Sequence, residues 1–171
     1  MPLTPIPCSI PVRELYYHGK VVYNTALSYS ICEEVPMSEK LTRKLEEHDP
    51  FGNYTGLTLT KWEKGYSQFV LKVNRKLLNP YGTLHGGAIF TMADSGMGWA
   101  LVSCLDKGER CVTIEAKIVY FKAVKTGTLT CDTRVIHKSK RIATLESEIK
   151  HGSELIAKVI STWSIYEANG E

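Results

Sequence analysis

The apolar residues between Gly87 and Cys104 repeat with the period of an α-helix. The turn residues Asn79-Pro80 and Gly82 come just before this segment and do not fit a helix. A stripe of this kind is typical of a helix that buries one face. Its positions are Ile89, Met92, Ala93, Gly96, Met97 and Ala100. We therefore predict one long helix over residues 83–104.

The segments on either side of this helix alternate apolar and polar residues with the period of a β-strand. Before the helix, a Lys64-Gly65 turn separates two such runs, which contain Leu57, Leu59, Phe69, Leu71 and Val73. After it, strands are predicted near residues 111–122, 128–138, 141–150 and 154–166. This order predicts an α+β fold, in which a curved antiparallel sheet wraps around the apolar stripe of one helix.

Residues 1–36 differ from the rest of the chain and hold five of its seven prolines. Their strand-like stretch, Leu15–Tyr23, is broken by His18-Gly19. We predict a poorly ordered extension over 1–36 and a single domain over 37–171, with an added strand or interface arm as the alternative for the extension. Within the domain, Ser38 is expected to cap a short helix that ends by Asp49-Pro50.

Composition excludes several classes of function. The content of 43% hydrophobic and 23% charged residues is ordinary for a soluble globular domain. A net charge of +3, without a basic run and interleaved aromatics, gives no indication of a nucleic-acid partner. The five cysteines are scattered without a C-x-x-C pair, so reduced thiols in a cytoplasmic protein are expected. We also predict no metal site and no membrane span, because ligand spacing and an apolar run of ~18 residues are both missing.

The start of the predicted helix carries candidate chemistry. Gly86 and Gly87 place free backbone N–H groups and the positive end of the helix dipole where no side chain blocks a carbonyl oxygen. Asp94 lies roughly 130° from the centre of the apolar stripe, so it is not forced into the core. From His85 to Asp94 the helix rises about 13 Å. A site that uses both ends of this stretch is therefore expected to lie between two subunits.

These residues carry a resemblance to a known family. The segment Asn79-x-x-Gly82-x-x-His85-Gly86-Gly87, followed by Asp94, resembles the motif of hotdog-fold acyl-CoA thioesterases of the phenylacetic-acid-degradation type. The similarity continues through residues 112–115 and 120–123 and extends from about Phe51 to Tyr166. It implies a hotdog fold, hydrolysis of an acyl- or aryl-CoA thioester, and a homodimer or homotetramer. The thioester is then the substrate, and no cofactor is implied.

The resemblance implies a role for each motif residue. Asp94 is expected to act as general base or as nucleophile, and Gly86 N–H to bind the developing oxyanion. His85 shapes the helix entry, or serves simply as its cap. Asn79 contributes an amide near the water or carbonyl, or acts purely as a turn residue. Thr113 matches a hydroxyl position that holds the water; its alternative is a β-branched strand residue.

Other features leave alternatives open. Lys138, Lys140 and Arg141 form a basic hairpin tip that could grip the phosphates of coenzyme A, although most such clusters are solvated turns. Glu115 alternates with Thr113 on the predicted strand face, with no independent reason for a catalytic role. The rival functions are a hotdog hydratase or dehydratase, which uses a catalytic histidine, and a non-catalytic acyl-CoA sensor, which lacks the carboxylate.

Overall fold

The computed structural model of the chain describes residues 15–17, 20–22 and 49–168, which fall into two compact units. In the first unit, strands β1 (Leu15–Tyr17) and β2 (Lys20–Val22) pair antiparallel on either side of residues 18–19. The helix expected to start at Ser38 lies outside the described residues. The division of the chain at residue 36 stays a prediction.

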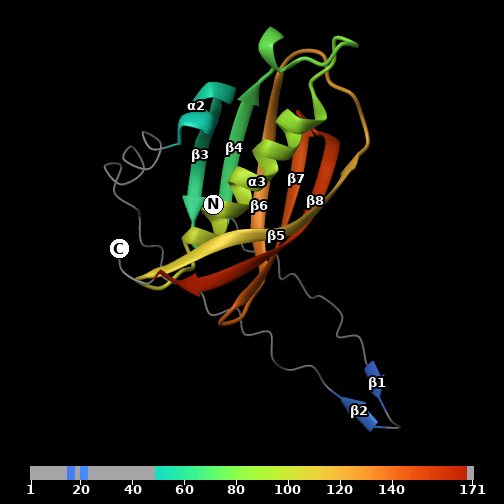
Figure 1. Cartoon of the computed structure of the whole chain (residues 1–171). Coiled ribbons are helices and arrows are strands. Elements are labelled where there is room, and N and C mark those ends of the chain that lie inside the picture. Colours follow the sequence, from blue (N-terminus) through green and yellow to red (C-terminus); the bar gives the residue numbers. More distant parts are fainter. Residues whose placement is uncertain (1–14, 18–19, 23–48, 169–171) are drawn as a thin grey trace, which may run out of the picture. The chain divides into compact units, whose positions relative to one another are not determined.

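The second unit contains one curved antiparallel sheet in the order β3-β4-β6-β7-β8-β5 (Figure 1). Its strands are β3 (Leu57–Glu63), β4 (Tyr66–Lys72), β5 (Glu109–Tyr120), β6 (Thr128–Lys138), β7 (Ile142–His151) and β8 (Glu154–Glu167). The four strands predicted after the helix agree with these bounds to within two residues. The sheet leaves β3 and β5 at its two edges.

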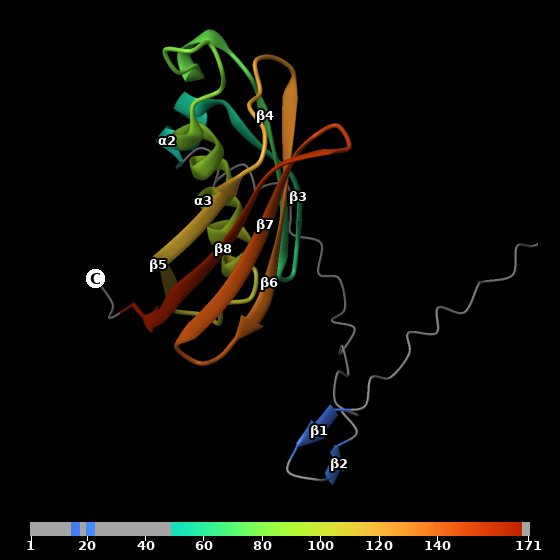
Figure 2. The ribbon, with the colours of Figure 1, turned by 90° about the vertical axis from the view of Figure 1, so that its right-hand side faces the viewer.

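Helix α3 (Gly86–Val102) lies along the concave face of the sheet (Figure 2). Every residue of the predicted apolar stripe is buried, and Leu101 adds to it. The helix starts three residues later than predicted, because the chain still forms a turn and a capping residue up to His85. The core between helix and sheet includes the fully buried side chains of Leu71, Met92, Met97, Leu129, Leu145 and Ile149. The predicted α+β hotdog architecture is thereby confirmed.

The helix approaches the sheet most closely at Gly96. A Cβ on this residue would lie 2.7 Å from Thr133 Oγ1 on β6. The hydroxyl of Ser67 on β4 donates to the Gly96 carbonyl at 2.7 Å, and Thr133 shares a 2.7 Å hydrogen bond with Ser147 on β7. These hydroxyl residues are register partners across adjacent strands. A row of small polar residues therefore makes room for the helix backbone and satisfies its own hydrogen bonds there.

In the part of the chain that the structure describes, two short helical segments lie outside the long helix. Helix α2 (Pro50–Thr55) begins at the position where the sequence analysis ended an earlier helix, and the sequence analysis did not predict α2 itself. Asp49 caps this helix by accepting from Gly52 N–H at 2.8 Å, and proline suits the first helical position because its missing N–H would have no partner there. A 3₁₀ turn, η1 (Arg75–Leu77), precedes the loop that leads into α3. Within the described ranges, none of the helices is long and apolar enough to cross a bilayer.

Candidate active site

The loop before α3 is held together by the side chain of Asn79. Its Oδ1 accepts from the N–H groups of Tyr81 at 2.9 Å and Thr83 at 3.2 Å, and its Nδ2 donates to Thr83 Oγ1 at 2.8 Å. Gly82 takes a φ of 72°, which glycine adopts without steric cost. The structure thus gives Asn79 a turn-forming role. A contact between its amide and a reacting group stays a prediction.

His85 is the N-cap of α3. Its ring Nδ1 accepts a hydrogen bond from Gly87 N–H at 2.8 Å. Its carbonyl oxygen accepts from Ala88 at 2.9 Å and from Ile89 at 3.4 Å. These bonds use the backbone donors of the first helical turn, with one exception. Gly86 N–H has no partner in the part of the chain that the structure describes.

The two glycines of the motif therefore differ in whether their N–H group is available to a ligand. Gly87 N–H is occupied by the His85 ring, whereas Gly86 N–H is free at the positive end of the helix dipole. A carbonyl oxygen that gains negative charge would be stabilised by such a donor. Gly86 is thus the residue of this pair that can bind an oxyanion through its backbone.

Asp94 lies in the middle of α3 and is half-buried. Its Oδ1 accepts a hydrogen bond from Thr113 Oγ1 of β5 at 2.9 Å. The structure thereby brings two of the predicted site residues together. Because Oδ1 is held, the second carboxylate oxygen, Oδ2, has a defined orientation. Oδ2 has no partner among the described residues. This oxygen is free to take up a proton or to attack a carbon.

A β-bulge in β5 determines which side chains face the helix. The pairing of β5 with β8 shifts between Thr113 and Glu115, so the strict alternation expected there was wrong. Thr113 points toward Asp94, whereas Glu115 is exposed and accepts from Thr162 Oγ1 at 3.2 Å. Bulges commonly re-aim side chains near functional sites. Glu115 consequently lies outside the candidate site.

Gly86 and Asp94 are well separated within one chain. They are eight positions apart on α3, which corresponds to a rise of about 12 Å. A thioester carbonyl carbon and its oxygen are about 1.2 Å apart, close to the length of a peptide C=O. One reacting group cannot contact both residues of the same helix. Within one chain, the free N–H and the carboxylate therefore do not converge on one small reacting group.

The strand beside Asp94 is an edge of the sheet and carries exposed apolar side chains. β5 pairs with β8 on one side and with no described strand on the other. Val112 is 51% exposed and Ile114 is 56% exposed, and Ile160 of β8, which pairs with Lys117 further along β5, is 50% exposed. Edge strands offer a row of unpaired backbone groups that can pair with another chain. This exposed apolar edge lies beside Thr113 of the candidate site.

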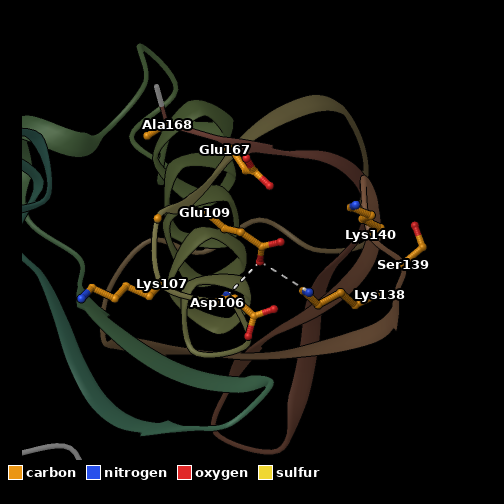
Figure 3. A pocket seen from close by; sticks show the side chains of 9 residues that line it. Asp106, Lys107, Glu109, Lys138, Ser139, Lys140, Glu167 and Ala168 are labelled. Carbon is orange, nitrogen blue, oxygen red and sulfur yellow. Dashed lines mark hydrogen bonds and ion pairs between the residues drawn. The ribbon is translucent and has the colours of Figure 1, made fainter. Parts of the chain in front are cut away.

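The basic hairpin tip lines an open hollow of about 650 Å³ between the β6–β7 turn and the loop after α3 (Figure 3). Lys138 is engaged there, since its Nζ lies 3.7 Å from Glu109 Oε2. Lys140 also lines the hollow, whereas Arg141 does not. Asp106, Glu109 and Glu167 bring negative charge to the same walls. Binding of phosphates by Lys138, Lys140 and Arg141 stays a prediction.

Tyr120 is a residue that the sequence analysis did not single out as part of the site. Its hydroxyl donates to the carbonyl oxygen of Gly86 at 2.9 Å, across 34 positions of sequence. An aromatic residue at the end of a strand has no pattern that would reveal such a bond in advance. The family resemblance places this residue in the next strand but attaches no role to it.

The described residues contain no group of three or more His, Cys, Asp or Glu side chains that could hold a metal ion. The candidate site therefore consists of a carboxylate, a hydroxyl and a backbone donor. Asp94 and Thr113 supply the first two at one end, and Gly86 supplies the third at the other. These are the groups that acyl transfer to water needs when the leaving group is good.

Comparison with known proteins identifies the family of this architecture. Residues 81–158 match the family described as the thioesterase superfamily. The chain is 36% identical over 137 residues to the protein named "Putative esterase SSO1253" of Saccharolobus solfataricus, with 79% of this chain and 91% of the relative covered. It is 26% identical over 104 residues to the acyl-coenzyme A thioesterase PaaI of Escherichia coli, covering 60% and 72% of the two chains.

Solved structures agree with this assignment. The conserved protein PA5202 of Pseudomonas aeruginosa superposes with a TM-score of 0.67 at 32% identity, covering 68% of this chain and 94% of that one. The Escherichia coli PaaI protein from the phenylacetic acid degradation operon superposes with a TM-score of 0.68 at 22% identity, covering 77% and 93%. The chain therefore belongs to the thioesterase superfamily, as a hotdog-fold member that resembles PaaI.

Proposed function

We propose that this protein hydrolyses an acyl- or aryl-CoA thioester to the free acid and coenzyme A. Membership of the thioesterase superfamily supports the class of reaction, and the likeness to a relative named acyl-coenzyme A thioesterase supports the CoA thioester. The observation that carries the proposal is the presence, on one helix, of a carboxylate held by a hydrogen bond and of a backbone N–H without a partner. Asp94 is fixed by Thr113, and Gly86 N–H is the unpartnered donor of the helix start.

The proposed reaction needs few groups because a thiolate leaves readily. In the general-base route, a water oxygen attacks the thioester carbon while its proton passes to Asp94. The carbonyl oxygen becomes an oxyanion that accepts from a Gly86 N–H. The tetrahedral intermediate then collapses, the C–S bond breaks, and the CoA sulfur leaves with the bonding electron pair. The proton on Asp94 returns to this thiolate or to solvent.

The alternative route uses Asp94 as the nucleophile. Its free Oδ2 would attack the thioester carbon, expel the thiolate and form a mixed anhydride that water then hydrolyses. A single turnover in ¹⁸O-water detects the anhydride where water opens it at its aspartyl carbon. The general-base route places the label in the product acid alone, whereas water attack on the aspartyl carbon of the anhydride places it in Asp94. Mass spectrometry of the peptide that contains Asp94 reads this label.

We infer that each site is shared between two subunits. The separation of about 12 Å between Gly86 and Asp94 supports a second copy as the source of the missing half. A two-fold axis between antiparallel helices would place the Gly86 of one protomer against the Asp94 of the other, so that a dimer holds two equivalent sites. The exposed edge of β5, with Val112 and Ile114, supports strand pairing as the interface. We extend this to a homodimer that assembles further into a homotetramer, as the family resemblance implies.

Two further parts of the proposal concern the ligand and the compartment. Lys138, Lys140 and Arg141 are proposed to attract the CoA phosphates, and Lys140 is more available than Lys138, which already pairs with Glu109. The cysteines Cys104, Cys111 and Cys131 are free thiols, which supports a cytoplasmic location. Neither a cofactor nor a nucleic acid enters the proposed reaction.

The rival functions differ in what they require of His85 and Asp94. A hydratase would need the histidine to move protons, but here the Nδ1 of His85 is used to cap the helix. A sensor without catalysis would have no need for a carboxylate that a neighbouring hydroxyl holds in place. Both rivals are therefore less well supported than hydrolysis.

The test is a hydrolysis screen of the full chain against short-chain, long-chain and aromatic acyl-CoA thioesters, with release of free thiol as the readout. We expect saturable turnover with at least one class. Binding of several acyl-CoA thioesters without turnover of any would favour the sensor. Hydration of an enoyl-CoA without thiol release would favour the hydratase.

A further inference from the structure

The first two residues of α3 leave room for a substrate, but they have a low propensity to form a helix. Gly86 and Gly87 leave space for a carbonyl oxygen, but glycine has the widest backbone freedom and a low helix propensity. A donor N–H is useful in a transition state only when its direction is fixed beforehand. Two consecutive glycines therefore need ties from outside the helix if Gly86 N–H is to point in one direction.

Tyr120 supplies such a tie. Its hydroxyl donates to the Gly86 carbonyl at 2.9 Å, and a Cβ on Gly86 would lie 3.2 Å from the Cζ and Oη atoms of this ring. The ring thus occupies the side of Gly86 where another residue would carry its side chain. The same segment makes a second tie, since Leu84 N–H donates to the carbonyl of Val124 at 2.7 Å. The chain that follows β5 therefore braces the entry of the helix.

The Tyr120 bond continues through the backbone into His85. The carbonyl of Gly86 and the N–H of Gly87 belong to one peptide group, which accepts from Tyr120 at its oxygen and donates to His85 Nδ1 at its nitrogen. Hydrogen bonds at the two ends of one peptide strengthen each other. Because Nδ1 is an acceptor, the neutral His85 ring carries its proton on Nε2. Partial burial raises the pKa of the Tyr120 hydroxyl, which keeps its own proton available as the donor.

We propose that Tyr120 is a positioning residue that holds the Gly86–Gly87 peptide and so directs the Gly86 N–H toward the reacting carbonyl. This inference rests on the proposed hydrolysis, because it assigns Gly86 N–H to the oxyanion. Tyr120 does not itself touch the substrate in this account. It acts through the main chain of the helix start.

The test uses Tyr120→Phe in the full chain, which keeps the ring and removes the hydroxyl. Tyr166→Phe is the matched control, because Tyr166 is also on a strand and its exposure of 47% equals that of Tyr120, 46%, within one percentage point. We expect Tyr120→Phe to lower kcat roughly three- to tenfold and to leave KM within about twofold. The control should leave both constants unchanged.

Two further measurements report on the hydrogen bonds of the helix start, independently of the reaction rate. In ¹⁵N-labelled protein, Tyr120→Phe should speed hydrogen exchange at Gly87 N–H and shift the ring nitrogens of His85 away from a pure Nε2–H tautomer. Tyr166→Phe should change neither signal. Unchanged exchange at Gly87 and an unchanged His85 tautomer in Tyr120→Phe would overturn the inference, whatever happens to kcat. Changed signals with an unaltered kcat would overturn it as well, because the held peptide would then not serve the reaction.

Failure of this inference and failure of the proposed function are distinguishable. If the wild-type chain hydrolyses no thioester, the proposed function fails, yet the exchange and tautomer signals still report whether Tyr120 holds the peptide. If the wild type is active and Tyr120→Phe matches it in every readout, the function stands and the positioning role of Tyr120 is excluded.

Discussion

Asp94 is the residue on which both proposed reaction routes depend. Asp94→Asn keeps the size of the side chain but can neither accept the proton of water nor attack a carbon. We expect kcat to fall about 10²–10⁴-fold, with the melting temperature little changed. Glu63→Gln is the control, since Glu63 is an exposed carboxylate at the end of β3 and does not line the hollow proposed for the phosphates. Turnover of Asp94→Asn within about threefold of wild type, below the usual range for an acid–base group, would remove Asp94 from the mechanism.

Two substitutions at Gly86 distinguish the role of its N–H donor from the role of the space that its missing side chain leaves. Proline is well tolerated at the first position of a helix, and His85 has the extended backbone, φ −63° and ψ 134°, that a residue before proline adopts. Gly86→Pro therefore deletes the donor while the helix start is kept. Gly86→Ala is the control that adds a Cβ and retains the N–H. We expect Gly86→Pro to lower kcat about 10²–10³-fold relative to Gly86→Ala.

The effect of Gly86→Ala itself should be steric. Its Cβ would press on the Tyr120 ring at 3.2 Å, so slowing should grow with the bulk of the acyl group. Steady-state kinetics with a short and a bulky thioester measure this, and the melting temperature serves as the control. Equal kcat for Gly86→Pro and Gly86→Ala would show that the glycine is needed for the turn and not for its donor.

The sequence predicted some of these residues better than others. Gly86 and Asp94 could be placed because helix periodicity fixes their separation, and Thr113 because the family motif includes it. Tyr120 could not, because its bond to Gly86 joins distant positions through a backbone carbonyl, which leaves no pattern of residue types. The occupation of Gly87 N–H by His85 was likewise hidden, since it depends on the rotamer of one ring.

The packing of α3 on the sheet depends on Gly96. Gly96→Ala would place a Cβ 2.7 Å from Thr133 Oγ1, on a β-branched side chain inside the sheet. Overpacking of this kind should lower the free energy of unfolding by about 1–3 kcal/mol. Gly98→Ala in the same helix is the control, because its Cβ would meet Trp163 at an ordinary 3.4 Å. That variant should be unchanged or stabilised by up to about 1 kcal/mol through helix propensity.

Chemical denaturation of the two variants measures this difference. Equal stability of Gly96→Ala and Gly98→Ala would show that the helix can move away from the sheet without cost. It would also show that the row of small hydroxyl residues below Gly96 does not set the distance between helix and sheet.

The carboxyl group of Asp132, on the outer face of the sheet, should make the stability of the fold depend on pH. Burial alone raises the pKa of Asp132, but hydrogen bonds from Tyr66 and Gln68 and the charges of Lys150 and Arg134 hold it below its ordinary 3.8. A carboxyl group whose folded-state pKa is lowered stabilises the fold above its unfolded pKa, and this contribution is lost as the pH falls through the folded value. We therefore expect the melting temperature to fall once the pH drops below the ordinary carboxyl pKa of 3.8.

Asp132→Asn tests the assignment, because an amide cannot lose stability by protonation. The variant should be less stable than wild type at neutral pH and should show a smaller decline in acid. Glu148 contributes in the same direction, since hydrogen bonds from Lys150 and Lys158 lower its pKa, so some decline should remain. Identical pH profiles for the two proteins would exclude Asp132 as a source of the dependence.

At the level of helices and strands, periodicity predicted the sheet and α3 well, and local chemistry explains the errors. The α3 start moved because His85 caps the helix from an extended conformation. The α2 helix was missed because Asp49-Pro50 was interpreted as an end. The same pair begins a helix when the aspartate caps it and proline takes the first position. The bulge after Thr113 breaks alternation without any glycine or proline to announce it.

The assembly of whole molecules is the level that one sequence predicts least. The separation of Gly86 from Asp94 supports the proposed shared site, but in such a site two protomers would shape the acyl pocket, and one sequence does not place their side chains. The same limit applies to the basic tip, where Lys138 proved to be paired with Glu109 at the start of the preceding strand, β5. Contacts of this kind depend on geometry that no residue spacing encodes.

The shared site is tested most directly by mixing two inactive variants. Asp94→Asn subunits retain Gly86, and Gly86→Pro subunits retain Asp94, so a mixed dimer contains one complete site and one that lacks both groups. Subunits with different affinity tags allow mixed dimers to be purified after co-expression and counted. Because one of the two sites of a mixed dimer is complete, we expect the purified mixed dimers to show roughly half of the wild-type rate per subunit, against almost none for either variant alone. Mixed dimers that form in full and remain as inactive as their parents would contradict a site built from two subunits.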